Sequence, residues 1–226
     1  MPEQRYAIWG AAGHAKVLAS LIALRGGRVV ALFDRQDLPP VLPGVPLFVG
    51  EAGFARWADS EPMPDQVIGL VAIGGARGRD RMDILQLFRE RGLRLASLVH
   101  PDSSVCATAT LGAGTQVLAQ AVVAADARIG EACIVNHRAS VDHECVLGDG
   151  VHVAPGATLC GLVTLGDNVM IGAGAVVLPR MRIGENSVIG AGAGGTRGVP
   201  AGRAVFGNPG RPAPTPTPGE DSHDAL

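Results

Sequence analysis

The sequence is poor in several features that would place it in a common class. Its 226 residues include only 5 Phe, 2 Trp and 1 Tyr, so aromatic side chains cannot supply most of a buried core. Its longest apolar stretch, Val67 to Gly75, is far shorter than the ~20 residues that span a bilayer. The first residues lack the charged-then-apolar layout of a signal peptide, because their apolar run stops at Gly10 and Gly13. We therefore expect a cytoplasmic protein without membrane insertion.

Charge and cysteine usage exclude further classes. The 19 Lys and Arg nearly balance the 21 Asp and Glu, giving a formal charge of −2. Non-specific nucleic-acid binding needs a clustered excess of basic residues, so we expect no nucleic-acid partner. None of the 4 cysteines belongs to a C-x-x-C pair. This spacing favours the interpretation that the cysteines are reduced thiols in the cytosol.

A six-residue repeat fills the second half of the chain. Cutting the sequence every six residues from Val99 gives sixteen consecutive units that end at Gly194, and each unit begins with an aliphatic residue. The fifth residue is Ser, Ala, Thr or Cys in twelve of the units. A single unit cannot bury its own aliphatic residue, so neighbouring units must stack into a solenoid with a continuous core. The aliphatic positions are Val99, Val105, Leu111, Val117, Val123, Ile129, Val135, Val141, Leu147, Val153, Leu159, Leu165, Ile171, Val177, Ile183 and Ile189.

This repeat resembles the hexapeptide repeat of acyltransferases that fold as a left-handed parallel β-helix. The resemblance implies triangular coils of three hexads each. Each residue would then lie beneath the residue eighteen positions later, at about the 4.8 Å spacing of neighbouring strands.

The first ninety residues follow a different pattern, in which short apolar strands alternate with helices. Alternation of this kind predicts a small parallel sheet with helices on its faces. We expect strands at Tyr6–Gly10, Val29–Asp34, Val67–Ile73 and Leu93–Leu98, and helices at Gly13–Leu24, Glu51–Ala58 and Arg81–Arg91; prolines between 39 and 46 mark a loop.

Three domains follow from these patterns. Residues 1–94 are expected to form an α/β, Rossmann-like domain. Residues 95–206 are expected to form the all-β left-handed β-helix. Residues 207–226 form a C-terminal extension, and its distal, proline-rich and polar part is expected to be disordered.

A glycine-rich turn between the first strand and the first helix is the first candidate site. Gly10–His14 (GAAGH) places bare backbone N–H groups and a helix N-terminus where they can hold phosphate. Asp34 ends the second strand, where such folds place a carboxylate against a ribose or base. Gly74–Gly75 after the third strand offers a second close approach to backbone. About ninety residues correspond to half of a dinucleotide fold, which favours a mononucleotide.

The second candidate site is the segment Asn136–Glu144 (NHRASVDHE) in the repeat. Imidazole is a suitable general base near neutral pH, and a neighbouring carboxylate raises its basicity. His143 is the third residue of its hexad, at an outward corner, with Ala125 stacked below it and Gly161 above it. Neither neighbour has a side chain that would crowd a reacting group, and the Gly161 N–H could stabilise an oxyanion. His137 occupies the same hexad position one face earlier, so the two imidazoles need not share a site.

Three histidines of the repeat are candidates for a metal site, because some β-helix enzymes bind zinc through three histidines between subunits. His137, His143 and His152 are six and nine residues apart, and folding could join them only across a subunit boundary. We therefore expect no metal.

Both halves together resemble one branch of the hexapeptide-repeat acyltransferases, the sugar-nucleotide N-acetyltransferases and the sialic-acid O-acetyltransferases. The resemblance implies a homotrimer with acetyl-coenzyme A (acetyl-CoA) along the outside of the β-helix, between adjacent subunits. Besides the hexads, it is carried by Gly10–Lys16 (GAAGHAK), Val99–Pro101 (VHP), Asn136, Val141–Glu144 (VDHE) and Phe206–Pro209 (FGNP).

The resemblance also implies that residues 1–94 bind a sugar nucleotide and that residues 95–206 carry the acetyltransferase site, and it assigns roles to individual residues. His143 matches the general base, Glu144 the acid that strengthens it, and Gly161 the oxyanion donor. The matches for acetyl-CoA contacts are His152, Ala173 and Ala191. The matches for sugar-nucleotide contacts are Ala12, Gly13, His14, Asp34, Arg35 and Gly75.

One departure concerns the nucleotide. Two consecutive acids are expected in uridine-nucleotide members, whereas this chain has Asp34-Arg35, which is compatible with a GDP- or dTDP-linked sugar. We hypothesise acetyl transfer from acetyl-CoA to the amine of a nucleotide-linked amino sugar, such as a 4-amino-4,6-dideoxy sugar, for surface glycan synthesis. The alternatives are a sialic-acid O-acetyltransferase, a zinc-dependent enzyme of carbonic-anhydrase type, and a non-catalytic nucleotide-sugar-binding scaffold.

Overall fold

The computed structural model describes residues 3–212. The chain forms two compact units. The first contains the residues up to Gly74 together with Arg79–Ser97, and the second contains Gly75–Gly78 together with the residues from Leu98 onward. The predicted disordered part of the extension falls on residues 213–226, outside the described residues.

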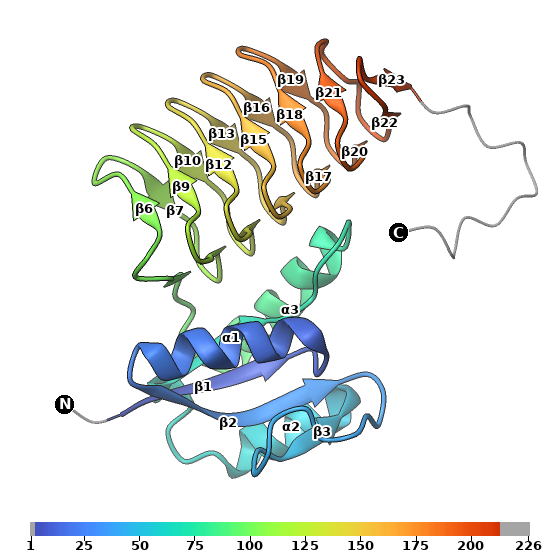
Figure 1. Ribbon diagram of the computed structural model, residues 1–226. Helices are drawn as coiled ribbons and strands as arrows, with labels where there is room; N and C mark the ends of the chain where they lie inside the picture. Colours follow the sequence, from blue (N-terminus) through green and yellow to red (C-terminus); the bar gives the residue numbers. More distant parts are fainter. Residues whose placement is uncertain (1–2, 213–226) are drawn as a thin grey trace, which may run out of the picture. The chain divides into compact units, whose positions relative to one another are not determined.

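The first unit is built on a four-stranded parallel sheet with the order β3-β2-β1-β4 (Figure 1). Its strands are β1 (Gln4–Trp9), β2 (Gly27–Asp34), β3 (Leu47–Val49) and β4 (Val67–Val71), and its helices are α1 (Gly13–Leu24), α2 (Gly50–Ser60), the 3-10 turn η1 (Pro64–Gln66) and α3 (Gly78–Glu90). Figure 1 shows α1 on one side of the sheet and α2 on the other. Seven of the eight aromatic residues lie in this unit, so the aromatic-poor composition is a property of the repeat.

The core of the first unit is a cluster of aromatic rings on one face of the sheet. Phe33 from β2 lies 5.0 Å from the ring centre of Phe54 and 5.2 Å from that of Trp57, both edge-to-face. Trp9 and Phe88 complete the cluster, with ring centres 6.4 Å apart. Such aromatic pairs add stabilising free energy to that which comes from burying their surface area.

One strand of this unit was not predicted, and one predicted strand was wrong. The expected proline-rich loop is present, but the short strand β3 that follows it was not predicted, because three residues are too few to show a period. The predicted strand Leu93–Leu98 is not continuous. Arg94 forms a single bridge to Ile68 at the edge of the first sheet, and Leu98 already belongs to the repeat. The alternation in LRLASL imitates a strand, but its two ends pair with different sheets.

The second unit is a parallel β-helix of very short strands in three sheets. Sheet I contains β5 (Leu98–Val99), β8 (Gln116–Val117), β11 (Ile134–Val135), β14 (His152–Val153), β17 (Met170–Ile171), β20 (Val188–Ile189), β22 (Ala204–Phe206) and β23 (Arg211–Pro212). Sheet II contains β6 (Ser104–Val105), β9 (Val122–Val123), β12 (Ser140–Val141), β15 (Thr158–Leu159), β18 (Val176–Val177) and β21 (Gly194–Gly195). Sheet III contains β7 (Thr110–Leu111), β10 (Arg128–Ile129), β13 (Val146–Leu147), β16 (Thr164–Leu165) and β19 (Arg182–Ile183).

The eighteen-residue register is present from Leu98 to Gly194. Ile129 pairs with Leu147, and Val141 pairs with Leu159. The first residue of each hexad from Val117 to Ile189 is buried. The predicted fold class, an α/β domain followed by a left-handed parallel β-helix, is confirmed.

The corners of the coils have a common backbone geometry. The fourth hexad residue has a positive φ angle in each hexad that begins between Leu111 and Ile189. The residues are Gly114, Gln120, Asp126, Ala132, Arg138, Glu144, Gly150, Gly156, Leu162, Asn168, Gly174, Arg180, Asn186 and Gly192. After Gly194 the repeat shortens, because Ile189 pairs with Val205 rather than with a residue eighteen positions later.

Among residues 3–212, no helix has the length and apolar character needed to cross a bilayer.

Candidate active site

The candidate residues of the β-helix occupy two different corners of the coil. The I–II corner, between sheets I and II, carries His137, Pro155, Ala173 and Ala191 in one column, each eighteen residues after the last. Hydrogen bonds from Gly156 N to His137 O (3.0 Å) and from Gly192 N to Ala173 O (2.8 Å) hold this column.

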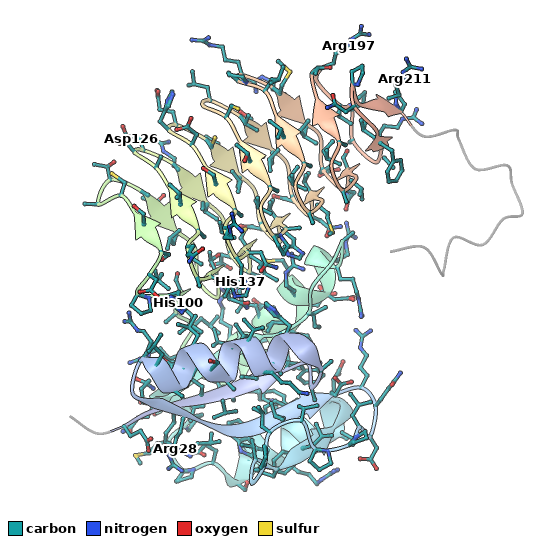
Figure 2. The ribbon with its side chains drawn as sticks, viewed as in Figure 1. Arg28, His100, Asp126, His137, Arg197 and Arg211 are labelled. Carbon is teal, nitrogen blue, oxygen red and sulfur yellow. The ribbon has the colours of Figure 1, made fainter. Side chains whose placement is uncertain are left out.

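The II–III corner, between sheets II and III, carries Ala125, His143 and Gly161. The bonds from Glu144 N to Ala125 O (2.9 Å) and from Leu162 N to His143 O (2.9 Å) hold that column. Figure 2 shows Asp126 and Arg197 on this corner and His137 on the opposite edge of sheet II.

His143 is held in a defined orientation on its corner. Its backbone N–H donates to Asp142 Oδ1 at 2.7 Å, and its Nδ1 lies 3.1 Å from Glu144 Oε2. Because an ionised carboxylate only accepts, Nδ1 carries the proton and Nε2 keeps its lone pair. The His143 side chain is 52% exposed, so that lone pair can meet a substrate from solvent.

Gly161 is the neighbour that His143 Nε2 faces. A Cβ at this position would overlap Nε2 and would lie 2.6 Å from His143 Cε1, so only glycine leaves room for the ring. Within residues 3–212 the Gly161 N–H makes no hydrogen bond to protein. The Nε2 lone pair of His143 and the N–H donor of Gly161 therefore belong to neighbouring residues. Acyl transfer needs both groups, one as a general base and one to stabilise the oxyanion.

A second imidazole cluster lies at the start of the I–II corner. Asn136 Oδ1 accepts the backbone N–H of His137 at 2.8 Å and lies 3.0 Å from His137 Nδ1. Asn136 Nδ2 lies 3.1 Å from His152 Nε2. His152 is buried, at 6% exposure, and its Nδ1 lies 3.4 Å from Gly75 O. The sequence indicated Asn136 only as part of a motif and did not predict that it bridges two histidines. That bridge depends on side-chain directions, which sequence spacing does not reveal.

The expected acetyl-CoA residues lie on a different part of the coil from the expected catalytic residues. Ala173 and Ala191 are exposed and stack in the I–II column, and His152 lies in β14 beside Asn136. His143, Glu144 and Gly161 belong to the II–III corner. Within one chain, sheet II separates the two groups.

In the first unit the glycine-rich turn and the end of β2 meet. Ala12 is the N-cap of α1, and Gly13 and His14 form its first turn. Asp34 Oδ2 accepts the Ala11 N–H at 2.8 Å, and its Oδ1 accepts the Gln36 N–H at 3.1 Å. The Asp34 carboxylate thus holds the turn in place.

The remaining sugar-nucleotide candidates are Arg35, next to Asp34, and Gly75. Arg35 Nη2 approaches Asp80 Oδ1 at 3.9 Å, and its side chain is 63% exposed. Gly75 groups with the β-helix beside His152, not with the turn. Sequence reasoning also missed a cavity of about 570 Å³ at the C-terminal end of the β-helix, which contains none of the predicted residues. Its lining includes Arg197, Arg203 and Arg211.

The thiols differ in environment, and none of the four cysteines, all of which lie within residues 3–212, forms a disulfide. Burial raises the pKa of the Cys145 thiol, whereas hydrogen bonding to the backbone of Thr108 lowers the pKa of Cys106. No group of three or more His, Cys, Asp or Glu within the described part of the chain could hold a metal ion.

Comparison with known proteins identifies the family of the β-helix and similar structures for the chain. The family model described as bacterial transferase hexapeptide (six repeats) matches residues 126–161 and 163–194. The acetyltransferase domain of PglB from Neisseria gonorrhoeae FA1090 in complex with acetyl coenzyme A is 34% identical, with a TM-score of 0.83; the alignment covers 93% of this chain and 100% of that one.

Two further structures are similar over most of their length. PerB from Caulobacter crescentus, in complex with CoA and GDP-perosamine, is 30% identical with a TM-score of 0.83, covering 92% of this chain and 97% of that one. WeeI from Acinetobacter baumannii AYE is 26% identical with a TM-score of 0.82, covering 92% and 99%. A search of curated proteins found no match.

Proposed function

Because this chain belongs to the hexapeptide-repeat acyltransferases and is similar over most of its length to sugar N-acetyltransferases, we propose that it acetylates the amine of a nucleotide-linked amino sugar. The donor is acetyl-CoA, and the acceptor is a 4-amino-4,6-dideoxy sugar of the kind used in surface glycans. The placement of His143 between Glu144 and Gly161 carries this proposal.

The three residues divide the chemistry between them. His143 Nε2 accepts a proton from the attacking amine, and Glu144 stabilises the imidazolium that forms, through the 3.1 Å contact with Nδ1. The nitrogen attacks the thioester carbonyl, whose electron pair moves onto oxygen, where the free Gly161 N–H can stabilise it. The C–S bond then breaks, and the proton held by His143 is delivered to the leaving thiolate. A neutral amide and a free thiol result.

The division between two corners supports a homotrimer. His143 and the column of Ala173 and Ala191 lie on opposite edges of sheet II, so one chain does not bring them together. In a cyclic trimer, the I–II corner of one copy can face the II–III corner of the next, and acetyl-CoA would lie in the groove between them. His152 lies near the start of that groove, beside Asn136.

The first unit supports the choice of a nucleotide-linked acceptor. The turn Ala12–His14 opens α1, where backbone N–H groups attract phosphate. Because the Asp34 carboxylate already accepts two backbone N–H groups, its role in this proposal is to shape the turn. Arg35 follows directly and leaves a cationic side chain for the nucleotide. This favours GDP- or dTDP-linked sugars as the first to be tested.

The test is thiol release from acetyl-CoA with a panel of acceptors: UDP-, GDP- and dTDP-linked 4-amino sugars and free sialic acid. We expect release with one amino sugar and a loss of about 10²–10⁴-fold in His143→Ala. Release with sialic acid alone would reassign the protein to O-acetylation. Binding of the nucleotide sugar without any thiol release would favour the non-catalytic, nucleotide-sugar-binding scaffold. Stoichiometric zinc in the purified protein would favour the metal-dependent alternative.

A further inference from the structure

The Asn136 amide fixes the protonation of His137, and its own orientation is determined by the backbone. The His137 main-chain N–H is always a donor, so the Asn136 atom 2.8 Å from it is the oxygen. The same oxygen lies 3.0 Å from His137 Nδ1, which must therefore carry a proton. The neutral His137 ring consequently has its lone pair on Nε2.

That lone pair is available to a ligand. Among residues 3–212, the His137 side chain makes its hydrogen bond through Nδ1 alone, and Nε2 has no partner. The side chain is half-buried at the I–II corner, directly below Pro155 and in the column that continues to Ala173 and Ala191. The proposed groove for acetyl-CoA therefore begins at an oriented acceptor that no step of the proposed mechanism uses.

The level of His137 along the β-helix matches that of His143. The two residues are six positions apart, which is one third of a coil and about 1.6 Å along the axis at a strand spacing of 4.8 Å. Rotation about a threefold axis parallel to the β-helix moves a corner sideways without changing its level. His137 of one copy would then face His143 of the next at nearly the same height.

We propose that His137 is a specificity-determining residue of the acyl-transfer site, contributed by a neighbouring copy, whose Nε2 accepts a hydrogen bond from the attacking nitrogen. This inference rests on the proposed function. A primary amine has two N–H donors, one for His143 and one for His137. A hydroxyl group has a single donor, which His143 takes, so the His137 lone pair would face oxygen without a hydrogen bond. The pair of imidazoles therefore favours N- over O-acetylation.

Substrate selectivity is the first test. GDP-perosamine and its 4-hydroxyl analogue serve as matched acceptors. In His137→Ala we expect kcat/KM for the amine to fall about 10- to 100-fold, the loss of one hydrogen bond to a charged or reacting group. The hydroxyl acceptor should change less than threefold. Gln120→Asn, one coil lower on the same corner, is the control and should leave both values unchanged. An equal fall with both acceptors, or no fall with the amine, would overturn the proposal.

Mixed trimers test which copy supplies His137. Chains carrying His137→Ala and chains carrying His143→Ala are co-expressed with different tags and purified together. If the residues come from different copies, about one third of the sites in these mixed trimers are intact, and the rate exceeds that of either parent. If one chain supplies both residues, the rate is only the average of the parents, which contradicts the proposal.

A measurement without turnover separates this inference from the proposed function. In ¹⁵N spectra of histidine-labelled protein, His137 should show the Nδ1–H tautomer, and Asn136→Ala should shift the ring towards a mixture. An Nε2–H ring in the wild-type protein would refute the assignment. If His137 shows the expected tautomer but no amine is acetylated, the proposed function is refuted while the assignment of the His137 tautomer remains supported.

Discussion

Gly161→Ala separates the chemistry of the candidate site from the stability of the fold. The Gly161 φ angle is in the ordinary range, so the backbone accepts alanine. The new Cβ would overlap His143 Nε2 and would lie 2.6 Å from Cε1 and 3.0 Å from Cδ2. Carbon atoms pack at about 3.5–4.0 Å, so the ring must move by about 1 Å.

The cost of that movement to the fold is small. The His143 side chain is 52% exposed and can turn towards solvent, which costs about 0.5–1.5 kcal/mol in rotamer preference. Catalysis depends on the position of Nε2, and a displacement of about 1 Å can lower a rate by about 100-fold. We therefore expect kcat to fall at least 100-fold, while the unfolding midpoint in urea changes little.

A matched control is Gly166→Ala, in the same coil. Its Cβ would lie 2.6 Å from Glu185 N and 2.9 Å from Glu185 Cα, which are backbone atoms of the next coil and cannot rotate away. This variant should lose about 1–3 kcal/mol of stability and keep its kcat. The double variant Gly161→Ala/His143→Ala should be no slower than His143→Ala alone. A normal kcat in Gly161→Ala, or multiplied losses in the double variant, would refute the reasoning.

Three further predictions concern stability, thiol reactivity and the groove. Arg5 donates to Glu61 at 2.6 Å and lowers the pKa of that carboxyl, so its ionised form stabilises the first unit. Glu61→Gln should cost about 1–3 kcal/mol at pH 7, and the difference should disappear as the pH falls through the lowered pKa, as followed by urea unfolding with tryptophan fluorescence. Cys106, whose pKa is lowered, should be alkylated by iodoacetamide before buried Cys145, as read by peptide mass spectrometry, and equal rates would contradict this. Ala173→Trp should raise KM for acetyl-CoA about 10-fold without changing kcat, and an unchanged KM would remove this column from the groove.

Sequence spacing determined most of the β-helix because a two-residue strand and a corner leave little freedom. Once the aliphatic position repeats every six residues, each residue has one partner eighteen positions later, and the stacking of Ala125, His143 and Gly161 follows directly. The first unit was less predictable. Strand β3 is too short to show a period, and the alternation before Leu98 was shared between two sheets.

In the candidate site, the sequence predicted only the contacts between residues that stack eighteen positions apart. The Asn136 bridge depends on the directions of three side chains. It also lies beside Gly75, which is far from the repeat in sequence and groups with it only in the folded chain. The six-residue repeat does not include that contact, so the directions of these side chains could not be assigned from spacing.

The division of the candidate residues between two corners is itself a physical constraint on function. A rigid coil cannot bring opposite edges of sheet II together, because each edge is held to the coils above and below by backbone hydrogen bonds. A site that uses both edges must be completed by another copy of the chain. Catalytic activity should then depend on assembly even when the coil is fully folded, and dilution below the dissociation constant of the oligomer should abolish acetyl transfer before any loss of β structure.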